Sequence, residues 1–140
     1  KEYASRIEKN YEKGIIEWKG FLPTIKFQEQ LGQCRAFLNT PKWNEAYGNV
    51  IVEALACGVP VIAYDLGGPG ELIENGLNGF LVQPNDLQGM IKATQSVSKI
   101  KRRNCRDWFE KNASNKVFAE RVENWINKGL NKNISADFQN

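Results

Sequence analysis

The sequence of 140 residues predicts an α/β fold, in which a Rossmann-like parallel sheet carries helices on both faces. Three observations support this prediction. Short runs rich in β-branched and aromatic residues alternate with helical patterns along the chain. The run from Pro60 to Tyr64 is almost entirely apolar, as in strands that are buried on both faces of a parallel sheet. The connections between these runs are short, so a helix is expected to link neighbouring parallel strands.

Strands are expected where the β-rich runs lie between Gly, Pro and Asn, over residues 15–18, 36–38, 60–64 and 79–82. Helices are expected over 24–33, over 49–57 and, briefly, over 71–74. The first of these helices has Thr24 as its expected N-cap.

After Asp86, which is a suitable helix cap, the remainder of the chain is expected to form three further helices. Their apolar side chains recur at the spacings of three, four and seven that place residues on one helix face. Trp108 and Trp125 lie at such positions and are therefore predicted to be core residues.

The length of 140 residues allows one substantial hydrophobic core rather than two. Residues 1–13 are charged and are expected to be the end of a helix, without the strand that normally opens an α/β unit. We therefore expect a piece of a longer protein, with one domain over residues 1–130 and a frayed polar tail over 131–140.

The composition excludes several classes of function. With 19 basic and 16 acidic side chains, the net charge is +3. This charge suits a small anionic ligand but does not indicate a nucleic-acid-binding surface. The absence of histidine excludes a Ser-His-Asp or Cys-His nucleophile within this sequence. The three cysteines, Cys34, Cys57 and Cys105, are too far apart and too few for a disulfide framework or a zinc site, which favours the cytoplasm. No apolar stretch approaches the roughly 18 residues that cross a bilayer.

Two loops should meet at one edge of the predicted sheet. The segments 40–48 and 65–70 each follow a strand, and the carboxyl ends of parallel strands face the same way. Ligands of open α/β sheets bind outside these carboxyl ends. The candidate site is therefore expected where the two loops come together.

The helix that follows the first of these loops begins with features that suit a phosphate. Gly48 lets a ligand approach the backbone closely, and the unpaired N–H groups of a helix N-terminus favour anions. Glu45 precedes this position, and Glu53 lies one turn beyond Asn49 on the same face. An acid in so apolar a helix needs an explanation, because Glu is rarely buried without a partner. Carboxylates suit sugar hydroxyls, so the spacing predicts a diphosphate with hydroxylated rings on both sides.

Other notable residues have simpler interpretations. The loop Gly67-Gly68-Pro69-Gly70 lacks both common phosphate-loop motifs, so a tight turn explains it at least as well. Glu71 lies in the first turn of the next expected helix, where its charge favours the helix dipole. Cys57 is interpreted as a small buried residue. The basic run from Lys99 to Arg106 is interpreted as a solvated helix junction, and contact with anionic lipid is the alternative.

The residues 44–82 also resemble a known family. The motifs that carry the resemblance are Glu45 and Glu53 with seven residues between them, the block Glu-Ala-Leu-Ala-Cys-Gly-Val-Pro-Val from Glu53, Gly67-Gly68 followed by Glu71, and Asn75-Gly76-Leu-Asn-Gly79. In these motifs the sequence resembles the retaining GT-B glycosyltransferases of family 4. The resemblance implies the C-terminal half of a GT-B fold, which binds a nucleoside diphosphate sugar.

The resemblance assigns the donor to acids, backbone amides and residues at the base edge, namely Glu45, Glu53, Tyr47, Gly48, Asn49, Val50, Phe21 and Leu22. Glu53 would bind the ribose hydroxyls, and Glu45, the catalytic residue of this assignment, would bind hydroxyls of the transferred sugar. The amides of residues 47–50 would surround the diphosphate, and Phe21 and Leu22 would meet the base.

The implied reaction transfers a sugar from a UDP-, GDP- or ADP-sugar to an acceptor hydroxyl and keeps the anomeric configuration. It would require no metal or other cofactor and would serve polysaccharide, lipopolysaccharide or glycolipid synthesis. The resemblance places this work in the cytoplasm or, with a peripheral membrane contact, at the inner face of the membrane. No nucleic-acid partner is expected.

The sequence departs from the family in two respects. It lacks the first strand and the following loop, whose cations neutralise the diphosphate, and it lacks the N-terminal acceptor domain, toward which the last helix crosses. We therefore expect weak donor binding, no transfer by this chain alone, and some exposed apolar side chains on the last helix. The alternatives are a related GT-B epimerase or phosphorylase and a non-catalytic α/β nucleotide-binding or interaction module. A receiver-like module is disfavoured because Asp65 follows a strand but no pair of Asp residues precedes it.

Overall fold

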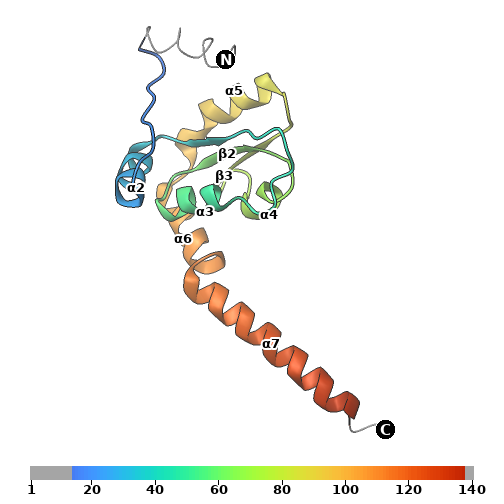
Figure 1. The fold of residues 1–140 in the computed structure, drawn as a ribbon. Helices are drawn as coiled ribbons and strands as arrows, with labels where there is room; N and C mark the ends of the chain where they lie inside the picture. Colours follow the sequence, from blue (N-terminus) through green and yellow to red (C-terminus); the bar gives the residue numbers. More distant parts are fainter. Residues whose placement is uncertain (1–13, 138–140) are drawn as a thin grey trace.

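A computed structural model describes residues 14–137 and contains a parallel sheet of three strands (Figure 1). The expected helix end over residues 1–13 lies outside the described residues. The strands are β1 (Phe37–Asn39), β2 (Val61–Tyr64) and β3 (Gly79–Val82), in the order β1-β2-β3. Consecutive right-handed crossovers in one direction place their connecting helices on one face of a sheet.

Helices cover both faces of this sheet, as predicted. The crossover helices α3 (Asn49–Ala56) and α4 (Pro69–Leu72) lie below the sheet in Figure 1, and α5 (Leu87–Ser96) lies above it. The remaining elements are α2 (Thr24–Gln33), the short 3₁₀ helix η1 (Val97–Lys99), α6 (Arg102–Asn112) and α7 (Asn115–Asp137). The α/β fold class and the parallel sheet are therefore confirmed.

The first of the four predicted strands, over residues 15–18, is wrong. The segment is coil, and Ile15 and Trp18 are 75% and 77% exposed. A β-rich run forms a strand only when a neighbouring strand accepts its hydrogen bonds and its side chains pack. In the described part of the chain β1 is the edge of the sheet, and no strand pairs with its outer side.

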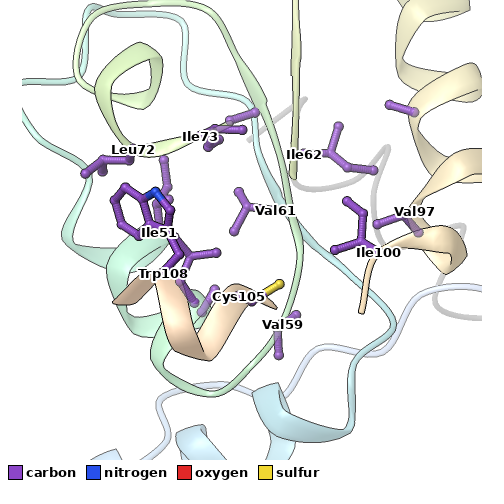
Figure 2. Packing of buried hydrophobic residues seen from close by; sticks show 14 of the residues in the cluster. Ile51, Val59, Val61, Ile62, Leu72, Ile73, Val97, Ile100, Cys105 and Trp108 are labelled. Atoms are coloured by element: carbon purple, nitrogen blue, oxygen red, sulfur yellow. The ribbon is translucent and has the colours of Figure 1, made fainter. Parts of the chain in front are cut away.

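The core lies between α3, β2 and the later helices (Figure 2). Ile51 and Leu55 of α3, Val61 of β2 and Cys105 of α6 are fully buried. Trp108 is buried too, which confirms its predicted core position. Burial raises the pKa of the Cys105 thiol to about 11, because the interior disfavours the charged thiolate.

The long helix α7 differs from the prediction. Trp125 is 76% exposed rather than part of the core, because α7 leads away from the sheet and packs mainly against α6. The expectation that some apolar side chains of this helix are exposed is met. The helix continues to Asp137, so it extends through most of the segment 131–140 for which a frayed tail is expected. The division of the chain into a domain and a tail stays a prediction.

The other boundaries differ by one or two residues. Asp86 caps α5, since its carboxylate accepts a hydrogen bond of 2.8 Å from the backbone N–H of Gly89. Thr24 is the first residue of α2 rather than its N-cap, because Pro23 occupies the cap position without a side-chain hydrogen bond.

No helix in residues 14–137 is long and apolar enough to cross a membrane.

Candidate functional site

Two loops join at the carboxyl edge of the sheet. The backbone N–H of Glu45 donates to the carbonyl of Leu66 at 3.1 Å, and the N–H of Gly68 donates to the carbonyl of Glu45 at 2.7 Å. These bonds make an isolated parallel bridge between Glu45 and Gly67. The prediction that the loops 40–48 and 65–70 open at the same edge is therefore confirmed. The bridge also determines where the backbone of Glu45 lies.

Two glycines make this junction possible. Gly67 has a φ of +77°, and a Cβ on it would lie 2.5 Å from the carbonyl oxygen of Glu45. A Cβ on Gly68 would lie 2.4 Å from the carbonyl oxygen of Tyr47. Real side chains do not approach a backbone so closely, so only glycine allows the two loops to meet. The tight-turn interpretation of this loop is supported by these contacts.

The N-terminus of α3 lies at this junction with unpaired backbone donors. Gly48 adopts the left-handed conformation, with a φ of +98°, and its carbonyl accepts from the N–H of Ile51 at 2.9 Å. Within the described residues the N–H groups of Asn49 and Val50 have no hydrogen-bond partner, and no side chain caps the helix. The exposed end of an eight-residue helix therefore offers two donors and the positive end of its dipole.

The two acids of the site are both available to a ligand. Glu45 is half-buried beside the bridge, whereas Glu53 lies on the exposed side of α3. Neither carboxylate forms an ion pair or a hydrogen bond within residues 14–137. The sequence pattern predicts Glu53 to be an acid buried in an apolar helix. This interpretation is wrong, because Glu53 and the neighbouring Val50 are exposed and this side of α3 faces solvent.

A groove of about 670 Å³ lies between the start of α3 and helix α7. Its lining combines aromatic, aliphatic, amide and guanidinium groups, contributed by Tyr47, Asn49, Val52, Ala113, Asn115, Phe118, Arg121, Val122 and Trp125. The groove thus begins at two of the residues predicted to surround a diphosphate. Phe21 and Leu22 do not line it; Phe21 is 94% exposed in the coil before α2, so their contact with a base stays a prediction.

Two exposed arginines of the basic run donate hydrogen bonds to the ends of helices. The guanidinium of Arg102 donates to the carbonyls of Gly32 and Cys34 at 2.6 and 2.8 Å, and that of Arg106 donates to the carbonyl of Ala56 at 2.6 Å. Cations at helix C-termini satisfy carbonyls that lack an intrahelical partner. The basic side chains of the run are exposed, as predicted, and two of them also bond helix ends, which was not predicted from the sequence. The sequence signal was the i, i+4 spacing of the arginines on one face of an amphipathic helix.

Two further residues, Glu71 and Cys57, lie close to their predicted environments. Glu71 is in the first turn of α4, where it favours the helix dipole. Cys57 is partly buried rather than fully buried, and burial, with a smaller contribution from the carboxylate of Glu53, raises the pKa of its thiol. All three cysteines are free thiols. Residues 14–137 contain no group of three acidic or Cys side chains arranged to hold a metal ion.

Comparison with known proteins identifies the class of protein to which this fold and site belong. Residues 1–116 match the family described as glycosyl transferases group 1. The chain therefore belongs to this glycosyltransferase family.

Among the similar proteins is a sucrose synthase of Acidithiobacillus caldus, 36% identical over 101 residues, which are 69% of this chain and 13% of that protein. A D-inositol 3-phosphate glycosyltransferase of Rhodococcus erythropolis is 44% identical over 86 residues, 60% of this chain and 20% of that protein. The chain thus spans a fifth or less of the length of these curated relatives.

Solved structures agree on the fold. The Anabaena protein Alr3699/HepE, crystallised in complex with UDP, superposes with a TM-score of 0.69 and 29% identity over 88% of this chain and 36% of its own. It was also crystallised with UDP-glucose. A sucrose-phosphate synthase of Thermosynechococcus elongatus has a TM-score of 0.75 at 20% identity, over 91% of this chain and 34% of its own. The α/β sheet is that of GT-B glycosyltransferases.

Proposed function

We propose that these residues form the donor-binding half of a retaining glycosyltransferase of family 4. The observation that carries the proposal is the pair of free N–H groups at the start of α3, between the available carboxylates of Glu45 and Glu53. This arrangement suits a diphosphate with a hydroxylated ring on either side. Crystals of a similar protein with UDP and with UDP-glucose support a nucleotide-sugar as the ligand.

In the proposed mechanism, the enzyme stabilises the departing diphosphate rather than providing a nucleophile. The amides of residues 47–50 and the dipole of α3 would hold the negative charge that grows as the bond to the sugar breaks. Glu45 would orient the sugar, Glu53 would hold the ribose, and Phe21 and Leu22 would approach the base. No metal is required in this scheme, because amides and cations supply the positive field.

The acceptor and the setting are part of the same proposal. The acceptor hydroxyl would belong to a growing polysaccharide, a lipopolysaccharide or a glycolipid, held by an acceptor domain of the whole enzyme. The donor could carry uridine, guanosine or adenosine, and UDP is the first to test. The reaction would take place in the cytoplasm, and Lys99, Lys101 and Arg103, which are exposed, would contact anionic lipid at its inner face.

The roles of the two acids can be separated by ligand titration. We expect Glu53→Gln to weaken the binding of UDP and of UDP-glucose alike by about tenfold, because a hydrogen bond to a charged group contributes about 1.5–3 kcal/mol. Glu45→Gln should weaken only UDP-glucose, because UDP lacks the sugar. Calorimetry or ligand-observed NMR would measure both constants.

Glu29→Gln is the matched control, since Glu29 is exposed on α2, far along the chain from the junction, and the change removes the same charge. Its affinities should equal those of the parent. If the Glu45 and Glu53 variants both bind like the parent, the assignment of the site is wrong.

We expect no sugar transfer by these residues alone, because the acceptor and the remaining cations would come from the rest of the enzyme. The measurement is release of UDP from UDP-glucose in the presence of sugar and lipid acceptors. Turnover above the rate without protein would contradict this expectation.

A further inference from the structure

The edge proposed to bind a diphosphate is rich in negative charge. Glu45 forms the bridge at the loop junction, and Asp65 precedes Gly67 by two residues. Glu71 lies in the first turn of α4, and Glu53 lies on the exposed side of α3. Each of these carboxylates repels a diphosphate, and two amide donors with a helix dipole offset such repulsion only in part. A cation close to the N-terminus of α3, in addition to those that the resemblance assigns to the preceding loop, would offset this repulsion.

The groove between α3 and α7 supplies one. Its lining includes Tyr47 and Asn49 from the beginning of α3 and the loop before it, together with Arg121 from α7, around a volume of about 670 Å³. We infer that Arg121 binds the diphosphate of the nucleotide donor from α7, across this groove. The inference rests on the proposed function, and it assigns the phosphate to a helix that sequence motifs do not connect with the donor site.

Arg121 is available for this role, whereas the arginines of α6 are engaged. Arg102 holds backbone carbonyls, Arg103 pairs with Asp107 at 2.7 Å, and Arg106 pairs with Glu110. Arg121 is exposed and forms no ion pair or hydrogen bond to any other described residue. A planar guanidinium with paired donors matches the geometry of phosphate oxygens.

The alternative cation is Lys42, which is exposed in the loop before Glu45 but does not line the groove. An ammonium on a flexible stem would act there as a compact point charge, without the paired donors of a guanidinium. The two candidates therefore predict different results for a Lys replacement of Arg121 and for removal of Lys42.

The position of Arg121 depends on the bend between α6 and α7. The hydroxyl of Ser114 donates to the carbonyl of Glu110 at 2.9 Å and accepts from the N–H of Val117 at 3.4 Å, so it ends one helix and caps the next. This cap directs α7 past the start of α3, which brings a residue 72 positions after Asn49 in the sequence into the same groove.

The test is titration of the full chain with UDP and with uridine. Arg121→Gln should weaken UDP by about tenfold and leave uridine unchanged, because uridine has no phosphate. Arg121→Lys should weaken UDP by only about threefold, since it keeps the charge and loses the paired donors. Added NaCl should lower the affinity of the parent more steeply than that of Arg121→Gln.

Lys128→Gln is the matched control on the same helix, because Lys128 is exposed and does not line the groove; it should bind UDP like the parent. If the parent and Glu53→Gln differ in UDP affinity but Arg121→Gln equals the parent, the inference about Arg121 is wrong and the proposed function stands. If Lys42→Gln alone weakens UDP, the cation is Lys42 instead. If the parent binds no UDP, both the proposed function and this inference are overturned.

Discussion

Replacing Gly68 by alanine should abolish UDP binding and destabilise the fold by about 1–3 kcal/mol, the typical cost of overpacking a well-packed site. The new Cβ would lie 2.4 Å from the carbonyl oxygen of Tyr47 and 2.7 Å from its Cα, so backbone rather than a flexible side chain must move. Moving it breaks the hydrogen bond from the N–H of Gly68 to Glu45 and displaces the start of α3. Urea denaturation would measure the stability, and a UDP titration would measure the binding.

Gly70→Ala is the control for this change. A Cβ there would meet only the carboxylate oxygen of Asp65, at 3.2 Å, and that exposed side chain can turn aside. Gly70 lies within α4, where alanine is the better helix former. Gly70→Ala should therefore keep the stability and UDP binding of the parent. A Gly68→Ala protein with the parent's unfolding midpoint would contradict the structural account of the loop junction.

Asn78→Leu should lower the free energy of unfolding by about 2–4 kcal/mol, because one buried and one partly buried backbone group lose their partners. Asn78 is fully buried; its Nδ2 donates to the carbonyl of Leu72 at 3.0 Å, and its Oδ1 accepts from the N–H of Glu74 at 2.8 Å. Leucine has the same branched shape but offers neither group, and its larger volume adds overpacking to the loss. Chemical denaturation with urea would measure the loss.

Asn75→Ala is the comparison for this prediction. The Asn75 side chain accepts from the N–H of Leu81 at 2.7 Å, but the site is exposed and water can replace the amide. The cost should therefore stay near 1 kcal/mol, the net contribution of a typical hydrogen bond. Equal losses for the Asn75 and Asn78 variants would show that burial does not decide the effect.

The central part of the fold could be predicted from the sequence because its signals are local. The helix that starts at Asn49, the turn at Gly58 and the apolar strand that ends at Tyr64 each follow from periodicity and from Gly and Pro positions within about ten residues. The same local reasoning placed the acids and the helix N-terminus at one edge, because parallel strands with short crossovers leave little choice of topology.

Local signals failed where the outcome depends on a distant partner. The run Ile15 to Trp18 has strand propensity but no neighbouring strand in the described structure, so it is coil. Trp125 has core spacing, yet its side chain is 76% exposed in the described structure. Arg102 belongs to a run that looks solvated, although its donors meet carbonyls about 70 residues earlier in the chain.

By itself the sequence determined the class of fold, the edge at which the two loops meet and the two acids proposed to bind the donor, since hydrophobic period and glycine placement act over a single element. Only the tertiary structure decided that Gly67 and Gly68 join the two loops, that Glu53 faces solvent, and that Arg121 shares a groove with Asn49. The physical reason is that these features are contacts between segments far apart in the chain, and no local pattern specifies which surfaces will meet when the helices pack.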